Sequence, residues 1–221
     1  ACIIALCAGQ YSVSVPEVTK ILASRFVNVT KTWSNTAEGV VFTLRLPRII
    51  GAVLVGSALS LSGAAYQGVF KNPLVAPDLL GVSSGACVGA SVAILLHLNS
   101  FGVQAMAFVA GILAVGLTLF IPRLIKNTNM TMLVLSGIIV KGIMDSVMGI
   151  IKYVADPETE LQSITYWQLG SLTKVLPKDL FTVGPVIVAA SVIIFLLRWR
   201  INILSLGDRE AKTLGVSVTV V

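Results

Sequence analysis

Gly81, Ser83 and Gly85 have the spacing of the G-x-S-x-G motif, in which a serine acts as the nucleophile of a hydrolase. That chemistry requires a strand–turn–helix arrangement in an α/β sheet, with acidic and histidine partners further along the chain. In this sequence the motif instead opens an apolar helical run, and the only histidine, His97, lies near the far end of that run. A hydrolase is therefore excluded.

Other catalytic and metal chemistry lacks the residues that it needs. Cys2, Cys7 and Cys87 lie in apolar segments without CxxC spacing, and we interpret them as small packing residues. A histidine-based metal site is not expected from a single histidine. The sequence has no GxxxxGK[ST] loop for ATP and no basic stripe with interleaved aromatic residues for nucleic acid. We predict no catalytic residue, cofactor, metal or nucleic-acid partner.

Lys141 and Asp145 stand out because they interrupt an otherwise apolar run. Residues four apart share one face of a helix. A charge near the centre of a bilayer costs about 2.5–3.5 kcal/mol on insertion scales, so both side chains should face protein or water. Two interpretations remain open: a mutually neutralised structural pair, or charges that line a polar path.

The composition is that of a membrane protein. Charged residues make up 12% of the chain, against about a quarter in soluble domains, and the mean hydropathy is +0.92. Long runs with few charges indicate membrane helices. Such runs occupy residues 49–70, 79–98, 104–121, 130–151 and 181–197. We predict an all-α fold, a polytopic membrane helix bundle, because irregular backbone cannot face lipid.

Both ends of the sequence look like parts of further spans. Residues 1–9 are apolar but too short to cross a bilayer, and the final VSVTVV resembles the opening of another apolar run. We therefore expect residues 1–221 to be a single transmembrane domain, truncated at both ends. Lysine and arginine are almost evenly divided between the two sets of loops, so charge does not decide the orientation.

Residues 12–26 predict a short helix that lies on the membrane surface. Ser14 and Glu17 have the spacing of a capping box, and Pro16 suits a first helical turn. An apolar face with helical spacing follows, made of Val18, Ile21, Leu22 and Phe26.

Small residues recur at every fourth position of the second and third predicted spans. The first set is Ala52, Gly56, Ser60, Ala64 and Gly68, and the second is Gly81, Gly85, Gly89 and Ala93. Such faces allow the backbones of neighbouring membrane helices to approach closely. We expect these two spans to be central helices of a tight bundle, and we assign no ligand to them.

Several motifs together resemble one family. They are RLPR at Arg45–Arg48, KNPLVAPDLLG at Lys71–Gly81, W-x-x-G-S at Trp167–Ser171 and LSLGDREAKTLGV at Leu204–Val216. The chain resembles the FecCD/BtuC-like permeases, the transmembrane subunits of type II ABC importers for iron-siderophores, haem or cobalamin. Val75 departs from the alanine that is usual in this family. The resemblance implies a fragment of a permease with roughly ten spans.

The resemblance also implies roles for the polar residues near the predicted outer surface. Arg45 and Arg48 would dock a soluble substrate-binding protein by pairing with its acidic side chains; the alternative is interfacial anchoring. Trp167, Gly170 and Ser171 would belong to the outer gate, although an interfacial tryptophan is commonly an anchor. Lys141 and Asp145 would line the translocation path, where the family usually has small or uncharged polar residues.

Residues 204–216 resemble the cytoplasmic coupling segment of ABC importers. Asp208 can cap a short helix and Gly215 can end it, which by itself suits any cytoplasmic turn. The resemblance implies that this helix fits a groove on the ATPase and transmits its movement. The residues expected to contribute are Gly207, Asp208, Glu210, Ala211 and Gly215.

The expected function is therefore that of a permease subunit, not an enzyme, which works by alternating access in the cytoplasmic membrane of a bacterium or archaeon. The expected partners are a second permease copy, two separate ATPase subunits, a soluble binding protein and the lipid bilayer. The resemblance favours a ferric siderophore or haem as cargo, then cobalamin, then an oxyanion.

Two alternatives remain. The first is a secondary transporter or channel without an ATPase, for which Asp145 is the only acidic candidate within a predicted span. The second is a purely structural membrane subunit. Neither needs docking or coupling segments, so both are less favoured.

Overall fold

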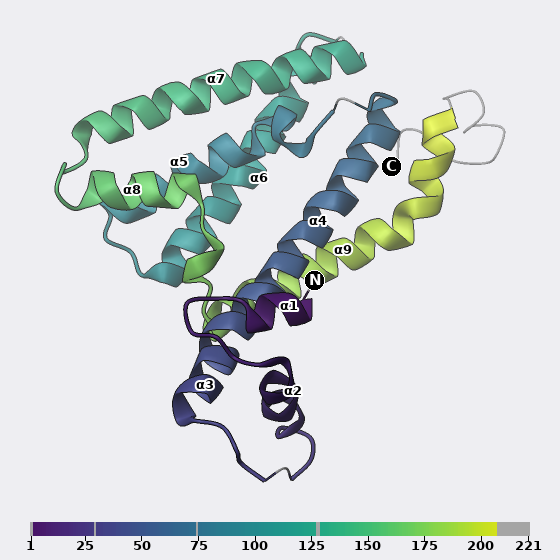
Figure 1. The fold of residues 1–221 in the computed structure, drawn as a ribbon. Coiled ribbons are helices and arrows are strands. Elements are labelled where there is room, and N and C mark those ends of the chain that lie inside the picture. The colour runs from purple at the N-terminus through teal and green to yellow at the C-terminus, as the bar shows by residue number, and fades with distance from the viewer. Residues whose placement is uncertain (1, 29, 74, 127–128, 207–221) are drawn as a thin grey trace. The chain divides into compact units, whose positions relative to one another are not determined.

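The computed structural model describes residues 2–28, 30–73, 75–126 and 129–206, and every regular element in these ranges is a helix (Figure 1). The elements are α1 (Cys2–Cys7), α2 (Val15–Ala23), α3 (Asn35–Gly39), the π-helix η1 (Val40–Arg45), α4 (Leu46–Phe70), the 3₁₀ helix η2 (Pro77–Leu80), α5 (Val82–Leu95), α6 (Ser100–Leu124), α7 (Met130–Val154), α8 (Glu160–Leu169), the 3₁₀ helix η3 (Leu172–Lys174) and α9 (Pro177–Leu206). The predicted all-α class is confirmed.

The chain divides into two compact units. Unit 1 comprises residues 1–62 and 171–198, and unit 2 comprises residues 63–170 and 199–221. Helices α4 and α9 each contribute one part to each unit.

Four helices among the described residues are long and apolar enough to cross a membrane, at Asn35–Phe70, Ser100–Leu124, Met130–Val154 and Pro177–Ser205. They contain four of the predicted runs. Helix α5 is shorter than the predicted range of 79–98: its 14 residues extend about 21 Å, against a hydrocarbon core of about 30 Å. It begins after Gly81, whose φ of +72° leaves the right-handed helical region, and a left-handed His97 (φ +52°) follows its end.

Helix α4 is preceded by a π-helical turn next to a proline. Pro47 lacks an N–H group, and its ring would clash with a carbonyl four residues earlier in a regular α-helix. The preceding π-helix η1 has a wider turn, in which the Leu46 N–H donates to the carbonyl of Val41, five residues back. The proline of the RLPR motif therefore explains the local change of helix type.

In unit 1, α2 packs on the start of the α3–α4 helix. Val18 and Ile21 are buried, as the predicted apolar face requires, but Phe26 is 91% exposed. Ser14 is the N-cap residue of α2, yet its side chain makes no capping hydrogen bond, so the predicted capping box is wrong. The core of this unit consists of Leu6, Val13, Val18, Ile21, Trp33, Ala37 and Val41.

In unit 2, α5 lies directly beside α6 (Figure 1). A Cβ atom placed on Gly85 would lie 2.5 Å from the Ala114 Cβ and 2.9 Å from the Ala110 carbonyl oxygen. A Cβ atom on Gly89 would collide with the Met106 carbonyl oxygen. These two helices therefore approach each other closely because glycine occupies the contact positions.

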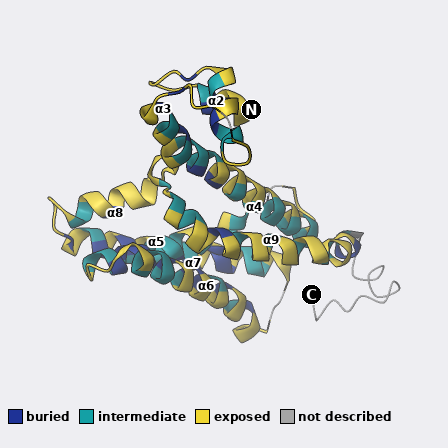
Figure 2. Cartoon of the chain, turned by 90° about the horizontal axis from the view of Figure 1, so that it is seen from below, coloured by how far each residue is buried: buried dark blue, intermediate teal, exposed yellow. Residues whose placement is uncertain are grey.

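Many residues along the long helices are exposed (Figure 2), and a large share of them are large apolar residues. Phe108 and Leu113 on α6 and Ile138 and Ile150 on α7 are each more than half exposed. A water-soluble protein rarely exposes such continuous apolar surface. The pattern agrees with helices that contact lipid or other transmembrane segments.

Candidate functional site

An ion pair joins the middle of α7 to the turn before α5. Lys141 Nζ lies 3.0 Å from Asp78 Oδ2 and donates a hydrogen bond to it. The side chains of both residues are about half exposed. Asp145, one turn further along α7, is exposed. The ion-pair partner of Lys141 is therefore Asp78, and the Lys141–Asp145 pair considered from the sequence is not the pair that forms.

The turn that carries Asp78 packs tightly between α6 and α7. The Leu79 carbonyl oxygen occupies the space that a Cβ atom on Gly137 of α7 would need. The Leu80 carbonyl oxygen accepts a 3.0 Å hydrogen bond from the buried Thr118 hydroxyl of α6. A Cβ atom on Gly81 would lie 3.5 Å from the Lys141 backbone nitrogen. The position of Asp78 is thus set by several independent contacts.

Asp78 is held in its ionised form. The hydrogen bond from Lys141 lowers the pKa of its carboxyl group below the ordinary value of 3.8, and a hydrogen bond with the Ser83 side chain lowers it further. Partial burial opposes both effects. The group is therefore charged at neutral pH, and its charge is compensated by Lys141.

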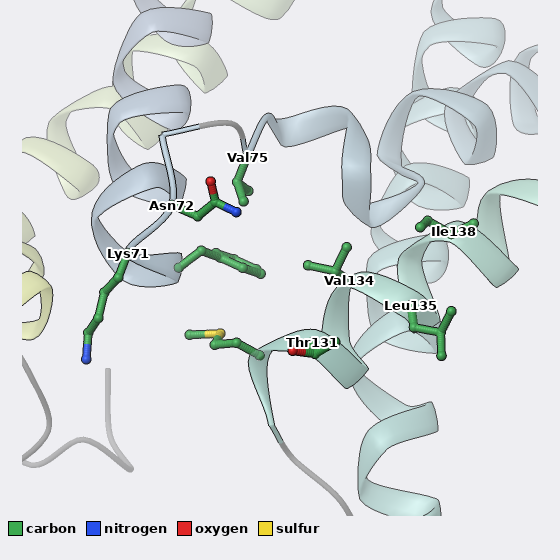
Figure 3. Close-up of a pocket in the computed structure, with 9 residues that line it drawn as sticks. Lys71, Asn72, Val75, Thr131, Val134, Leu135 and Ile138 are labelled. Carbon is green, nitrogen blue, oxygen red and sulfur yellow. The ribbon is translucent and has the colours of Figure 1, made fainter.

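A cavity of about 560 Å³ lies between the segment after α4 and the first half of α7. In Figure 3, Asn72 and Val75 face Val134 and its neighbours on α7 across this space, whereas the Lys71 amino group points away. Its complete lining is Phe70, Lys71, Asn72, Val75, Met130, Thr131, Val134, Leu135 and Ile138. Residues 70–72 and Val75 thus form one wall of a mixed polar and apolar cavity, shortly before the turn that carries Asp78.

Arg45 is bound to backbone carbonyl groups. Its Nη1 atom donates to the carbonyl oxygens of Leu6 at 2.5 Å and Cys7 at 3.2 Å, and its Nη2 atom donates to the carbonyl of Tyr11. Leu6 and Cys7 are the last residues of α1. A cation at the carbonyl end of a helix satisfies unpaired acceptors.

Arg48 has a different environment. Its Nε atom is buried and has no hydrogen-bond partner among the described residues. Arg45 and Arg48 both line a cavity of about 480 Å³ whose walls include Gly9, Tyr11 and Leu44. The two arginines of the RLPR motif therefore meet at one cavity but differ in their bonding.

The residues predicted for the outer gate lie at the end of α8. Trp167 is 37% exposed, and its carbonyl accepts a hydrogen bond from the Gly170 N–H. Gly170 ends the helix with a φ of +69° and has open space around it. Ser171 uses its side chain to cap η3. These contacts describe a helix end, and the gate role stays a prediction.

The predicted coupling residues Gly207, Asp208, Glu210, Ala211 and Gly215 lie outside the described residues. On α4, a Cβ atom on Gly56 would meet no atom within 4 Å, whereas one on Gly68 would lie 3.3 Å from the Ile201 side chain. Among the described residues, no group of three His, Cys, Asp or Glu side chains is arranged to hold a metal ion.

The sequence patterns did not identify Asp78, nor Thr118 and Gly137, which hold the turn before α5. Asp78 did carry a usable signal, because it is an acidic residue inside a proline-interrupted apolar segment. Thr118 and Gly137 carry no such signal. Each lies inside a long apolar helix, where the local sequence does not mark the residue that it contacts.

Comparisons with known proteins agree with one another. The model of the FecCD transport family matches residues 1–221. The molybdate import permease MolB of Haemophilus influenzae is 35% identical over 217 residues, which cover 98% of this chain and 64% of that protein. The hemin permease HmuU of Yersinia pestis is 36% identical over 183 residues, which cover 79% and 54%.

A solved structure has the same fold. It is a metal-chelate type ABC transporter in an inward-facing conformation, with a TM-score of 0.83 and 32% sequence identity. The match covers 99% of this chain and 65% of that one. The chain therefore spans between about half and two thirds of the length of these relatives.

Proposed function

Because the chain belongs to the FecCD transport family, we propose that it is part of the transmembrane permease subunit of a binding-protein-dependent ABC importer. The observation that carries the proposal is the structural similarity to an ABC transporter over 99% of the chain. The family match confirms the resemblance seen in the sequence, and with the long apolar helices it identifies a multi-pass protein of a prokaryotic cytoplasmic membrane.

The proposed mechanism is alternating access. A binding protein docks at the RLPR motif on the outer side, and closure of the ATPase subunits moves the permease through Glu210, Ala211 and the residues around them. The cargo passes beside α7, where the Asp78–Lys141 pair and the 560 Å³ cavity supply polar surface within a membrane-spanning helix. Trp167, Gly170 and Ser171 contribute to the outer gate.

The proposed assembly contains a second permease copy, two ATPase subunits and one soluble binding protein. ATP is hydrolysed on the ATPase subunits, since the sequence of this chain contains no Walker A loop. Apolar surface exposed on α6 and α7 is available for lipid and for further transmembrane helices.

For the cargo, we propose a metal chelate of the siderophore or haem type first, then cobalamin, then an oxyanion. Relatives are named for molybdate, cobalamin and hemin. This order follows the resemblance of the sequence motifs.

The alternative is a secondary transporter or channel that works without an ATPase. Asp145 would then be the ion-coupling residue, since it is exposed on a membrane-spanning helix. The family match argues for the importer, and an ATPase requirement separates the two functions.

The test uses the full-length protein in proteoliposomes, with the ATPase and binding protein of its own transport system. Uptake of a labelled ferric siderophore, hemin, cobalamin and molybdate is measured with and without ATP, and an ATPase variant that binds but does not hydrolyse ATP is the control. Uptake that requires hydrolysis supports the importer and identifies the cargo. Uptake that is driven by an ion gradient without ATPase supports the alternative.

A further inference from the structure

We propose that His97 is a positioning residue that links two helices of unit 2 in a proton-dependent way. When its imidazole is protonated, it holds the start of α8 against the end of α5 through Glu160, and when it is neutral this link is weaker. The link itself depends on the geometry of unit 2 alone. Its consequence for transport rests on the proposed function, because Trp167 and Gly170 of the predicted outer gate lie at the other end of α8.

The contact joins the chain just after α5 to the first residue of α8. His97 Nε2 lies 3.5 Å from Glu160 Oε1. The Glu160 side chain is only 17% exposed, and its second oxygen, Oε2, accepts a 3.0 Å hydrogen bond from the Asp156 N–H. The His97 side chain is 79% exposed, so it exchanges protons with the solvent. A fixed carboxylate therefore faces a group that can gain and lose a charge.

The backbone of His97 gives an independent reason to look for a role of its side chain. Its φ is +52°. The His97 N–H donates to the Ile94 carbonyl, and the Leu98 N–H donates to the Ala93 carbonyl, which is the Schellman arrangement that ends a helix. Glycine is the usual residue at this position, because a Cβ atom disfavours the left-handed conformation. The chain thus has an imidazole where glycine would be easier, and that imidazole reaches α8.

The two helix ends favour the charges of this pair. The carbonyl end of α5 favours a cation, and the N–H end of α8 favours an anion. Histidine is the side chain whose charge ordinarily changes between about pH 5 and pH 8. A protonated His97 beside an ionised Glu160 therefore stabilises the contact at the acidic end of this range, and the contribution is lost as the pH rises.

Other charged groups on the neighbouring elements have different surroundings. Helix α5 carries none, and the one on α6 lies in its last turn, at the far end from His97. Lys152 of α7 donates to Gln168 near the end of α8. The Asp156 carboxylate accepts from two backbone N–H groups of its own turn. The charged residues on these elements, apart from Glu160, are Arg123, Lys141, Asp145, Lys152, Asp156 and Glu158.

The other contacts of α8 leave room for such a link to matter. Ile164, in the middle of the helix, is buried in an apolar cluster with Met148 and Ile151 of α7. The bond from Lys152 to Gln168 holds the C-terminal half. The contact with His97 acts at the N-terminal end, so it limits how far α8 can turn about its buried centre.

The first experiment measures thermal unfolding of the purified full-length protein between about pH 5.5 and about pH 8. His97→Gly is compared with the wild type. Lys126→Gly is the matched control, because Lys126 follows α6 with a similar φ of +56°. We expect His97→Gly to be at least as stable as the wild type at the upper pH. At the lower pH the difference should move by about 1–2 °C in favour of the wild type. The effect of Lys126→Gly should be the same at every pH.

Two further variants test whether Glu160 is the partner. His97→Lys carries a positive charge at every pH in this range, so it should keep the link and remove its pH dependence. Glu160→Gln removes the charge of the partner, so His97→Gly made in that background should have the same effect at every pH. A pH-dependent effect of His97→Gly that persists with Glu160→Gln would overturn the pairing. An effect of His97→Gly on the wild type that is constant with pH would overturn the proton-dependent link.

The second experiment measures the transport consequence. The full-length protein is placed in proteoliposomes with its ATPase and binding protein, and the pH is varied on the side of the binding protein. The probe is the labelled cargo that the uptake test above identifies. At the lower pH, His97→Gly should take it up about twofold faster than the wild type, because α8 moves more freely. At the upper pH the two rates should be equal.

The outcomes separate the link from the importer. A constant ratio of the His97→Gly and wild-type uptake rates over this pH range would overturn the transport consequence. Uptake that does not require the ATPase would overturn the proposed function, while the unfolding measurements would still decide whether His97 links α5 to α8.

Discussion

Lys141 Nζ lies 3.0 Å from Asp78 Oδ2, so a residue in the middle of a membrane-length helix is paired with the turn before a neighbouring helix. That turn, η2, packs beside Gly137 in the first half of α7. Non-helical backbone beside a membrane-length helix is tolerated where protein or a water-filled cavity satisfies its polar groups. Here the Thr118 hydroxyl satisfies Leu80, and Lys141 satisfies Asp78.

The first prediction concerns this ion pair. Lys141→Met and Asp78→Asn should each lower the unfolding temperature of the full-length protein and slow uptake a few-fold, because each leaves an unmatched polar group beside α7. The charge swap Asp78→Lys with Lys141→Asp should recover much of both losses. Thermal unfolding and initial uptake rates measure the effects.

Asp145→Asn is the matched control for that experiment, because it removes a carboxylate from the same helix without touching the pair. It should change stability little. If Asp145→Asn were as harmful as Asp78→Asn and the charge swap recovered nothing, Asp145 would be the true partner of Lys141.

The second prediction concerns acid stability. The folded-state pKa of Asp78 is lowered, mainly by the hydrogen bond from Lys141. The ionised carboxylate therefore stabilises the fold above its ordinary pKa of 3.8, and this contribution is lost as the pH falls through the lower folded-state value.

The measurement is the difference in unfolding temperature between the wild type and Asp78→Asn, from about pH 6 to about pH 3. This difference in unfolding temperature should be constant near pH 6 and should shrink below the ordinary pKa of an aspartate carboxyl group. When both proteins also carry Lys141→Met, the difference in unfolding temperature should be small at every pH. A wild-type difference that does not change with pH would contradict the assignment.

The third prediction concerns the buried hydrogen bond from Thr118 to the Leu80 carbonyl. Thr118→Val keeps the shape of the side chain but leaves the carbonyl without a donor, and we expect it to destabilise the fold by about 1–3 kcal/mol. Thr118→Ser keeps the hydroxyl group and should cost less. Thr165→Val is the control, because Thr165 is exposed and its hydroxyl donates to the Leu161 carbonyl of its own helix. Equal losses for Thr118→Val and Thr165→Val would show that the bond to Leu80 is unimportant.

The long helices were predictable because their signal is local. The runs at 104–121 and 130–151 lie within α6 and α7, since an uninterrupted apolar stretch of this length has few other stable states in a bilayer. The shortness of α5 was harder to predict. Its apolar run is as apolar as the others. The helix is limited at its two ends by Gly81 and His97, whose left-handed backbone conformations cannot be read from composition.

The pairings were less predictable than the helices. The four-residue spacing predicted that Asp145 is the neighbour of Lys141. Such spacing describes contacts within one helix only, whereas Asp78 contacts Lys141 from a different element. The partners of Arg45 are backbone carbonyls, which every residue has and no sequence pattern marks. The glycines of α5 were found because small residues at every fourth position are a pattern within one helix.

The last prediction tests that glycine pattern at one of the close contacts between α5 and α6. Gly85→Ala places a Cβ atom 2.9 Å from the Ala110 carbonyl oxygen, and backbone atoms of a packed helix cannot move aside cheaply. We expect a loss of about 1–3 kcal/mol in stability. Gly116→Ala on α6 is the control: its Cβ atom meets nothing within 4 Å, so it should be neutral or stabilising by up to about 1 kcal/mol. Unfolding in detergent measures both, and equal effects would mean that α5 and α6 are not in close contact.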